Sequence, residues 1–191
     1  MIYFIADTHF YHKNIIKYCN RPFKNILDMN EALIRNWNET LKETDIIYHL
    51  GDVALCSDEL LEPIVKSLNG KKILIRGNHD TKSVVAFEKI GFTVLRNAPI
   101  TIDKYKIILS HVPLPDTMIP DGYINIHGHI HDKPLNESKH KGGRVEYPKE
   151  LYKPGNHFCV SVDVINFTPI SLEKVKKQKE IRKQIRGGNE E

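Results

Sequence analysis

Five short motifs contain side chains that could bind metal ions, and each motif follows an apolar run of the chain. The donors are carboxylates and imidazoles with one amide oxygen, and no thiolate is among them. This mixture suits Mn, Fe, Zn, Co or Ni better than the all-oxygen sites of Mg or Ca. The motifs supply seven candidate ligands and one further histidine, enough for two divalent cations. In chain order they are Asp7-Thr8-His9, Gly51-Asp52, Gly77-Asn78-His79-Asp80, Ser110-His111 and Gly128-His129-Ile130-His131.

The charge of such a site favours an anionic substrate. Two divalent cations bring about +4, whereas Asp7 and Asp52 return about −2, and a bridging hydroxide leaves about +1. Two cations roughly 3.5–4 Å apart can polarise phosphoryl oxygens, lower the pKa of a bridging water and stabilise an in-line transition state. The motifs therefore indicate hydrolysis of a phosphate ester.

The first half of the chain predicts alternating strands and helices. Asp28 and Thr81 are the expected caps of the first and third helices, and Pro63 should kink or restart the second. A β-α-β-α-β-α order favours a mainly parallel sheet, and ligands gather beyond the carboxyl ends of its strands. The motifs should therefore converge on one edge. The expected strands are 2–6, 45–50 and 72–76, and the expected helices are 28–43, 57–68 and 81–90.

The second half changes to short strands with short connections, followed by a last helix that opens at Ser171. Two long segments, 10–27 and 132–156, are irregular in pattern, and loops of that length are functional or mobile in most compact domains. The second of them is a candidate lid over the site. The expected strands of this half are 92–95, 100–102, 105–109, 123–126 and 158–162.

The five motifs together resemble the calcineurin-like metallophosphoesterases, which carry DxH, GD, GNH(D/E), a lone His and GHxH in this order. The resemblance implies a single-domain α/β fold, a four-layer α-β-β-α sandwich, and is strongest to the small bacterial, archaeal and phage members. It implies that Asp52 bridges two cations, that His79 binds substrate and protonates the leaving group, and that Asp80 orients His79. The implied ligands are Asp7, His9, Asp52 and His131 for one cation, and Asp52, Asn78, His111 and His129 for the other.

Other polar residues allow weaker predictions. His12, Asn14 and Arg21 follow the first motif and are candidate substrate contacts, because arginine can bind a phosphate through two nitrogens. The alternative is a solvated surface loop. The remaining histidines, which are His49, His127, His140 and His157, are expected to be structural.

Composition predicts one core and a cytoplasmic protein. The chain has 191 residues, 40% hydrophobic, and a net charge of +4, of which 173–191 contributes +3. We therefore expect a domain over 1–172 and a basic C-terminal helix or tail over 173–191. Three scattered cysteines favour a reducing compartment, and no apolar run approaches a membrane span.

These features predict a phosphoesterase with two transition-metal ions, Mn above the others, acting on a small monoester or diester. Two alternatives stay open. One is a nuclease that grips nucleic acid with the tail and with Lys139, His140, Lys141 and Arg144. The other is a protein-binding scaffold of the same fold, against which the intact His79 argues. The natural substrate and the oligomeric state are left undetermined by the sequence.

Overall fold

The computed structural model describes residues 1–135, 150–152 and 154–187. Most of the segment 132–156 that the sequence suggested as a lid lies outside these residues, as do the four basic residues of the nuclease alternative, Lys139 to Arg144. Within the described part, no helix combines the length and the apolar character that crossing a membrane requires.

The first sheet has the strand order β4-β3-β2-β1-β9. Strands β1, β2, β3 and β4 run parallel, and the short β9 pairs antiparallel with β1. The predicted strands are therefore present here, and β9 is an addition that the sequence pattern did not show. The bounds are β1 (Ile2–Ile5), β2 (Ile46–His49), β3 (Lys71–Ile75), β4 (Phe92–Leu95) and β9 (Ile170–Ser171).

The second sheet has the order β5-β6-β7-β8, with β6, β7 and β8 parallel and β5 antiparallel to β6. A 3-10 turn, η1 (Asp103–Tyr105), joins β5 to β6, one of the short connections that the sequence predicted. The last strand ends at Cys159, earlier than predicted. The bounds are β5 (Ile100–Ile102), β6 (Ile107–Leu109), β7 (Ile124–His127) and β8 (His157–Cys159).

The helices agree with the predicted pattern, but two predicted caps are wrong. Asn25 caps α2, because its side chain accepts the N–H groups of Leu27 and Asp28, so Asp28 lies in the first turn. Ser83, not Thr81, caps α4 through the N–H of Ala86. Helix α3 continues through its proline, and α1 interrupts the expected irregular segment 10–27. The bounds are α1 (Ile15–Tyr18), α2 (Ile26–Thr40), α3 (Asp58–Ser67), α4 (Val84–Ile90) and α5 (Leu172–Gly187).

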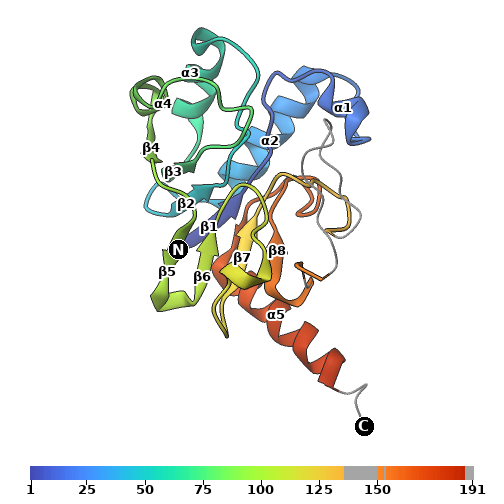
Figure 1. The fold of residues 1–191 in the computed structure, drawn as a ribbon. Coiled ribbons are helices and arrows are strands. Elements are labelled where there is room, and N and C mark those ends of the chain that lie inside the picture. The colour runs from blue at the N-terminus through green and yellow to red at the C-terminus, as the bar shows by residue number, and fades with distance from the viewer. Residues whose placement is uncertain (136–149, 153, 188–191) are drawn as a thin grey trace.

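Two hydrophobic core clusters lie between the layers of helices and sheets drawn in Figure 1. The first lies between the first sheet and α2, α3 and α4, around the fully buried Trp37 and Phe87. The second lies between the two sheets, around Phe4, and takes in Leu172 and Val175 of α5. The predicted single-domain α/β sandwich with two inner sheets is confirmed. The expected boundary after residue 172 falls in the first turn of α5, which packs into this core.

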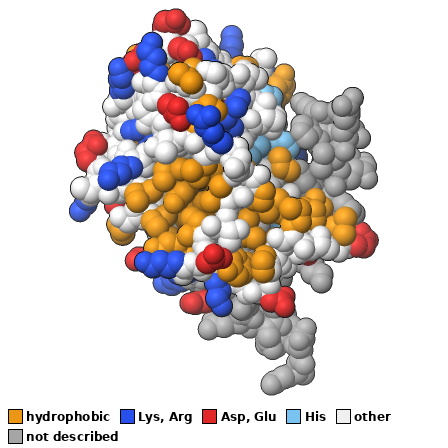
Figure 2. Space-filling view, turned by 60° about the vertical axis from the view of Figure 1, so that its left-hand side comes forward, with side chains coloured by type: hydrophobic (Ala, Val, Ile, Leu, Met, Phe, Trp, Pro, Cys, Tyr) orange, Lys and Arg blue, Asp and Glu red, His pale blue; other side chains and the backbone are white. Residues whose placement is uncertain are grey.

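The core between the sheets is partly exposed to solvent along one side. Edge strands β4 and β5 lie there, and Leu95, Ile100 and Ile102 pack on the core while keeping part of their surface exposed. Figure 2 is turned so that the side of the molecule with β4 and β5 comes forward, and it shows a broad apolar area on that face.

Candidate metal centre

The loops that follow β1, β2, β3, β6 and β7 carry all five motifs. These loops hydrogen-bond to one another directly: Asp7 N donates to Gly51 O at 2.9 Å, and Gly128 N donates to His111 O at 3.0 Å. The carboxyl ends of strands from both sheets therefore meet at one rim, where the sequence predicted convergence.

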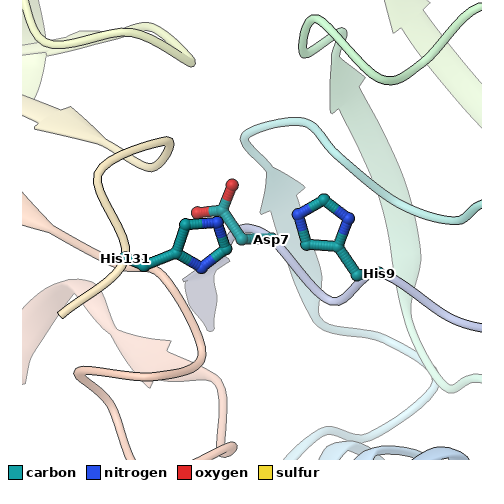
Figure 3. A group of neighbouring side chains, drawn as sticks. All are labelled: Asp7, His9 and His131. Atoms are coloured by element: carbon teal, nitrogen blue, oxygen red, sulfur yellow. The ribbon is translucent and has the colours of Figure 1, made fainter. Parts of the chain in front are cut away.

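The first ligand group consists of Asp7, His9 and His131, whose candidate ligand atoms all lie within 4.8 Å of one another. Figure 3 shows the Asp7 carboxylate next to the His131 ring, with the His9 ring to the right of both. Asp7 Oδ1 and His9 Nε2 are buried and have no hydrogen-bond partner among the described residues. Leaving buried acceptors unpaired costs free energy, and a cation would satisfy both atoms at once.

The second ligand group consists of Asp52, His111 and His129, again within 4.8 Å. His111 Nδ1 lies 2.7 Å from Leu50 O. Because a carbonyl can only accept, Nδ1 carries the proton, and the lone pair of Nε2 is left for a cation. That nitrogen lies 2.9 Å from Asn78 Oδ1 and 3.1 Å from His129 Nδ1, so the predicted donors converge on it.

The Asp52 carboxylate of the second group also faces the first group. Its Oδ2 is 3.6 Å from His9 Nε2 and 3.5 Å from His111 Nε2, while its Oδ1 accepts from His79 N at 2.9 Å. One oxygen thus faces nitrogens of both groups, which fits a carboxylate shared by two cations. The seven predicted ligands are brought together in one place.

Five of the ten non-glycine residues with positive φ in the described part of the chain are candidate ligands. Asp7, His9, Asp52, His129 and His131 have φ between +50° and +71°, a region that costs non-glycine residues roughly 1–3 kcal/mol each. Such strain is found mainly at functional sites, where the surrounding structure enforces it.

The motif glycines make room for the carboxylates. A Cβ on Gly77 would collide with Asp52 Oδ1, and one on Gly128 would lie 2.6 Å from Asp7 Oδ2. Glycine therefore precedes Asn78 and His129 because a ligand of another loop fills the space of a side chain.

The electrostatics show how unfavourable these groups are without a cation. Burial raises the pKa of Asp7 to about 7, although the neighbouring His131 opposes this. Burial also raises the pKa of Asp52 and lowers that of His9. Burial lowers the pKa of His131, but bonds to Asp163 and Cys19 and the Asp7 charge outweigh it and raise this pKa to about 10. Divalent cations would favour carboxylate and neutral imidazole together.

His79 is exposed at the rim, with its ring centroid 5.5 Å from that of His9. The expectation that Asp80 orients His79 is not what the structure shows. The Asp80 carboxylate accepts from the backbone N–H groups of Asp52 (2.8 Å), Val53 (2.9 Å) and Gly77 (2.8 Å). It joins the loops after β2 and β3 and so positions Asp52.

The three weaker candidates lie in different settings. His12 Nδ1 is 3.3 Å from His9 Nδ1, and its ring is 6.4 Å from that of His79, so His12 borders the site. Asn14 is exposed at the start of α1. Arg21 is only 4% exposed, and its guanidinium binds Asp163 and two backbone carbonyls, which places it in the protein interior instead of on a substrate-facing surface.

Sequence reasoning missed Asp163, which accepts from His131 Nδ1 at 2.6 Å. The signal was present, because Asp163 follows the apolar run 158–162 just as the ligands follow theirs. His49, His127 and His157 are buried outside both ligand groups, as a structural role requires, and burial lowers the pKa of His49 and His127 to about 3. His140 lies outside the described residues.

Comparison with known families agrees with this geometry. The model of a family described as calcineurin-like phosphoesterase matches residues 1–180. The chain belongs to the calcineurin-like phosphoesterase family. Its members depend on a dinuclear metal centre, and the chain has two groups of candidate ligands, with Asp52 Oδ2 facing a nitrogen of each. The family assignment supports a metal-dependent phosphoesterase in general.

Among relatives, an uncharacterized protein of Methanocaldococcus jannaschii is 41% identical over 194 residues, which cover 99% of this chain and 97% of that protein. The crystal structure of a protein of unknown function from Aquifex aeolicus is similar, with a TM-score of 0.69 and 30% identity. The match covers 93% of this chain and 98% of that one. The nuclease MPE of Pseudomonas putida matches with a TM-score of 0.44 and 22% identity, over 68% of this chain and 61% of that one.

Proposed function

We propose that this calcineurin-like phosphoesterase is a dinuclear enzyme that hydrolyses a small phosphomonoester or phosphodiester, with Mn as the preferred metal. The observation that carries the proposal is the position of Asp52 Oδ2, 3.6 Å from His9 Nε2 and 3.5 Å from His111 Nε2. Around it lie buried acceptors that a cation would satisfy. The donor set of imidazoles, carboxylates and one amide supports a transition metal.

When bound, the two cations would activate a water for in-line attack and polarise the phosphoryl oxygens. The chain's own residues supply the rest. Asn78 and His79 are exposed beside the ligand groups and can reach a substrate, whereas the ligands behind them are mostly buried. His79 is placed to protonate the departing alkoxide, as a general acid does.

His12 gains a specific role from its contact with His9. If His9 binds a cation through Nε2, its Nδ1 carries a proton and donates to His12 Nδ1, 3.3 Å away. The proton of His12 then sits on Nε2, where it can donate to a phosphoryl oxygen. Asn14 has no such link in the described part of the structure, and the Arg21 guanidinium already donates to Asp163 and to the Asp7 and Thr8 carbonyls.

The test is metal-depleted protein restored with Mn, Ni, Zn or Mg and assayed on monoesters, diesters and cyclic diesters. We expect turnover with Mn and none after chelation. Failure of every combination would overturn the proposal and favour the scaffold alternative.

His79→Ala sharpens the test. The nitrophenolate that leaves a p-nitrophenyl ester needs little protonation, whereas the alkoxide that leaves an alkyl ester must be protonated as it departs. The variant should therefore lose roughly 10²–10⁴-fold on the alkyl ester and far less on the p-nitrophenyl ester. Equal losses on both would contradict the assignment of His79 as general acid.

The salt dependence of turnover and of nucleic-acid binding distinguishes a small-ester substrate from a nucleic-acid substrate. Turnover of a small ester should change little between 50 and 200 mM salt, about the range in which a nucleic-acid contact of several phosphates loses orders of magnitude in affinity. Strong, steeply salt-dependent binding of DNA or RNA would favour the nuclease alternative instead.

A further inference from the structure

A buried carboxylate outside the five motifs contacts the first ligand group. Residues 160–162 run beside Ala6, with Ala6 N donating to Val160 O at 2.9 Å and Val162 N donating to Ala6 O at 3.0 Å. This pairing extends β1 and brings Asp163 next to the loop that holds Asp7. The Asp163 side chain is 4% exposed, and its Oδ2 accepts from His131 Nδ1 at 2.6 Å.

Arg21 completes the contact from the other side. Its Nε and Nη2 donate to the two Asp163 oxygens at 2.8 and 3.0 Å. The same guanidinium donates to the backbone carbonyls of Asp7 at 2.7 Å and Thr8 at 3.1 Å. One buried ion pair therefore joins the first motif of the chain to His131 of the last.

Stability alone does not explain this pair. Burying two charges costs desolvation energy, and an apolar replacement of similar volume is often at least as stable. What the pair adds is geometry: the two parallel bonds fix the guanidinium, and the remaining donors fix the strained Asp7-Thr8 backbone.

The pair also decides which nitrogen of His131 can bind a metal. An ionised carboxylate can only accept, so the bond to Asp163 keeps a proton on Nδ1, and Nε2 is the nitrogen that can release its proton and bind a cation. Second partners of this kind orient metal-binding histidines and fix their tautomer.

Cys19, His131 and Asp163 also lie within 4.8 Å of one another, a spacing that a separate metal site could use. Two features argue against such a site. Both Asp163 oxygens already accept from the Arg21 cation, which would repel a second one. His131 would also have to give up its Nδ1 proton, and with it the bond to Asp163.

We infer that Arg21 and Asp163 are positioning residues for the first ligand group. Asp163 holds His131 in the tautomer that presents Nε2, and Arg21 holds the Asp7-Thr8 backbone. This inference rests on the proposed dinuclear centre, but it concerns metal binding and not hydrolysis.

The test is direct measurement of Mn bound to Asp163→Asn, by equilibrium dialysis and metal analysis on protein shown to be folded by circular dichroism. An asparagine oxygen in place of Oδ2 leaves the amide NH2 facing Arg21 Nε, and one in place of Oδ1 leaves it facing His131 Nδ1 and Arg21 Nη2, so at least one present hydrogen bond is lost together with the negative charge. We expect one of the two cations to bind about 10–100-fold more weakly and the other to be unaffected. Unchanged affinity for both, or equal loss at both, would overturn the inference.

Two further variants make the result interpretable. Arg21→Lys keeps a positive charge beside Asp163 but cannot span to the Asp7 and Thr8 carbonyls, so it should show the same selective loss and decides the matter if Asp163→Asn does not fold. Asp116→Asn is the matched control. Asp116 Oδ1 lies 3.2 Å from His157 Nε2, and neither residue belongs to a ligand group. This control variant should bind two cations like the wild type.

A spectroscopic readout separates positioning from general loosening of the fold. In Zn-loaded wild type, the imidazole ¹⁵N signals of His131 should show a proton held on Nδ1 and the metal on Nε2, and the Asp163→Asn variant should lose that signature. If the wild type binds two cations and hydrolyses no ester, the proposed function fails while this inference stands. A wild type that binds fewer than two cations would overturn both.

Discussion

The replacement Asp80→Ala distinguishes two accounts of this carboxylate. The sequence motif suggests that Asp80 orients His79, in which case its loss should lower turnover and leave stability unchanged. In the structure its oxygens accept three backbone N–H groups, those of Asp52, Val53 and Gly77. Its loss should then destabilise the fold and displace Asp52.

The size of the effect follows from these bonds. Hydrogen bonds to a charged group contribute roughly 1.5–3 kcal/mol each, so three are worth about 6 kcal/mol before compensation. Burial raises the pKa of Asp80 to about 6, and removing this buried charge returns part of the loss. We expect a net decrease of about 3 kcal/mol in the free energy of unfolding. For a chain of this size, that corresponds to a decrease of roughly 6–12 °C in Tm.

The assay is urea unfolding of the metal-free protein, followed by Mn titration of the folded variant. His79→Ala is the comparison, because its ring is exposed and its loss should change stability by less than about 0.5 kcal/mol. Asp121→Asn, at an exposed surface site, should behave like the wild type in every measurement. If Asp80→Ala unfolds like the wild type, binds Mn normally and shows the kinetic defect of His79→Ala, the structural account of Asp80 is refuted.

Three further outcomes are expected. Gly128→Ala should weaken Mn binding at the first ligand group at least about tenfold, because the new Cβ meets Asp7 Oδ2; calorimetric titration with normal affinity would contradict this. His49 is buried, and its pKa falls from 6.5 to about 3 on folding, so its contribution to stability is complete above pH 6.5 and is lost as the pH falls toward 3. Between pH 6 and 4 the wild type should therefore lose about 1 kcal/mol per pH unit more than His49→Phe, as urea titrations at several pH values would show. Finally, Mn at about 100 times its Kd should stabilise metal-free protein by about 2.7 kcal/mol per site in thermal unfolding, and a Tm independent of Mn would exclude a folded-state cation site.

Much of the site could be predicted because its chemistry is local in sequence. A carboxylate or imidazole placed directly after an apolar run is recognisable without a structure, and parallel strands bring such ends to one edge. The ligands Asp7, Asp52 and His129 follow from this rule. Metal identity and substrate do not follow from it, since the same donors serve several transition metals and many esters.

The sequence by itself determined the donor atoms, the strands that carry them and the α/β class, because these depend on residue type and short-range pattern. Only the tertiary structure decided which partner each polar group has. Arg21 and Asp163 are 142 residues apart in the chain, and the Asp80 carboxylate binds amides 27 and 28 residues before it. A buried charge takes whichever donors the packed chain places within about 3 Å, and no local pattern encodes that choice.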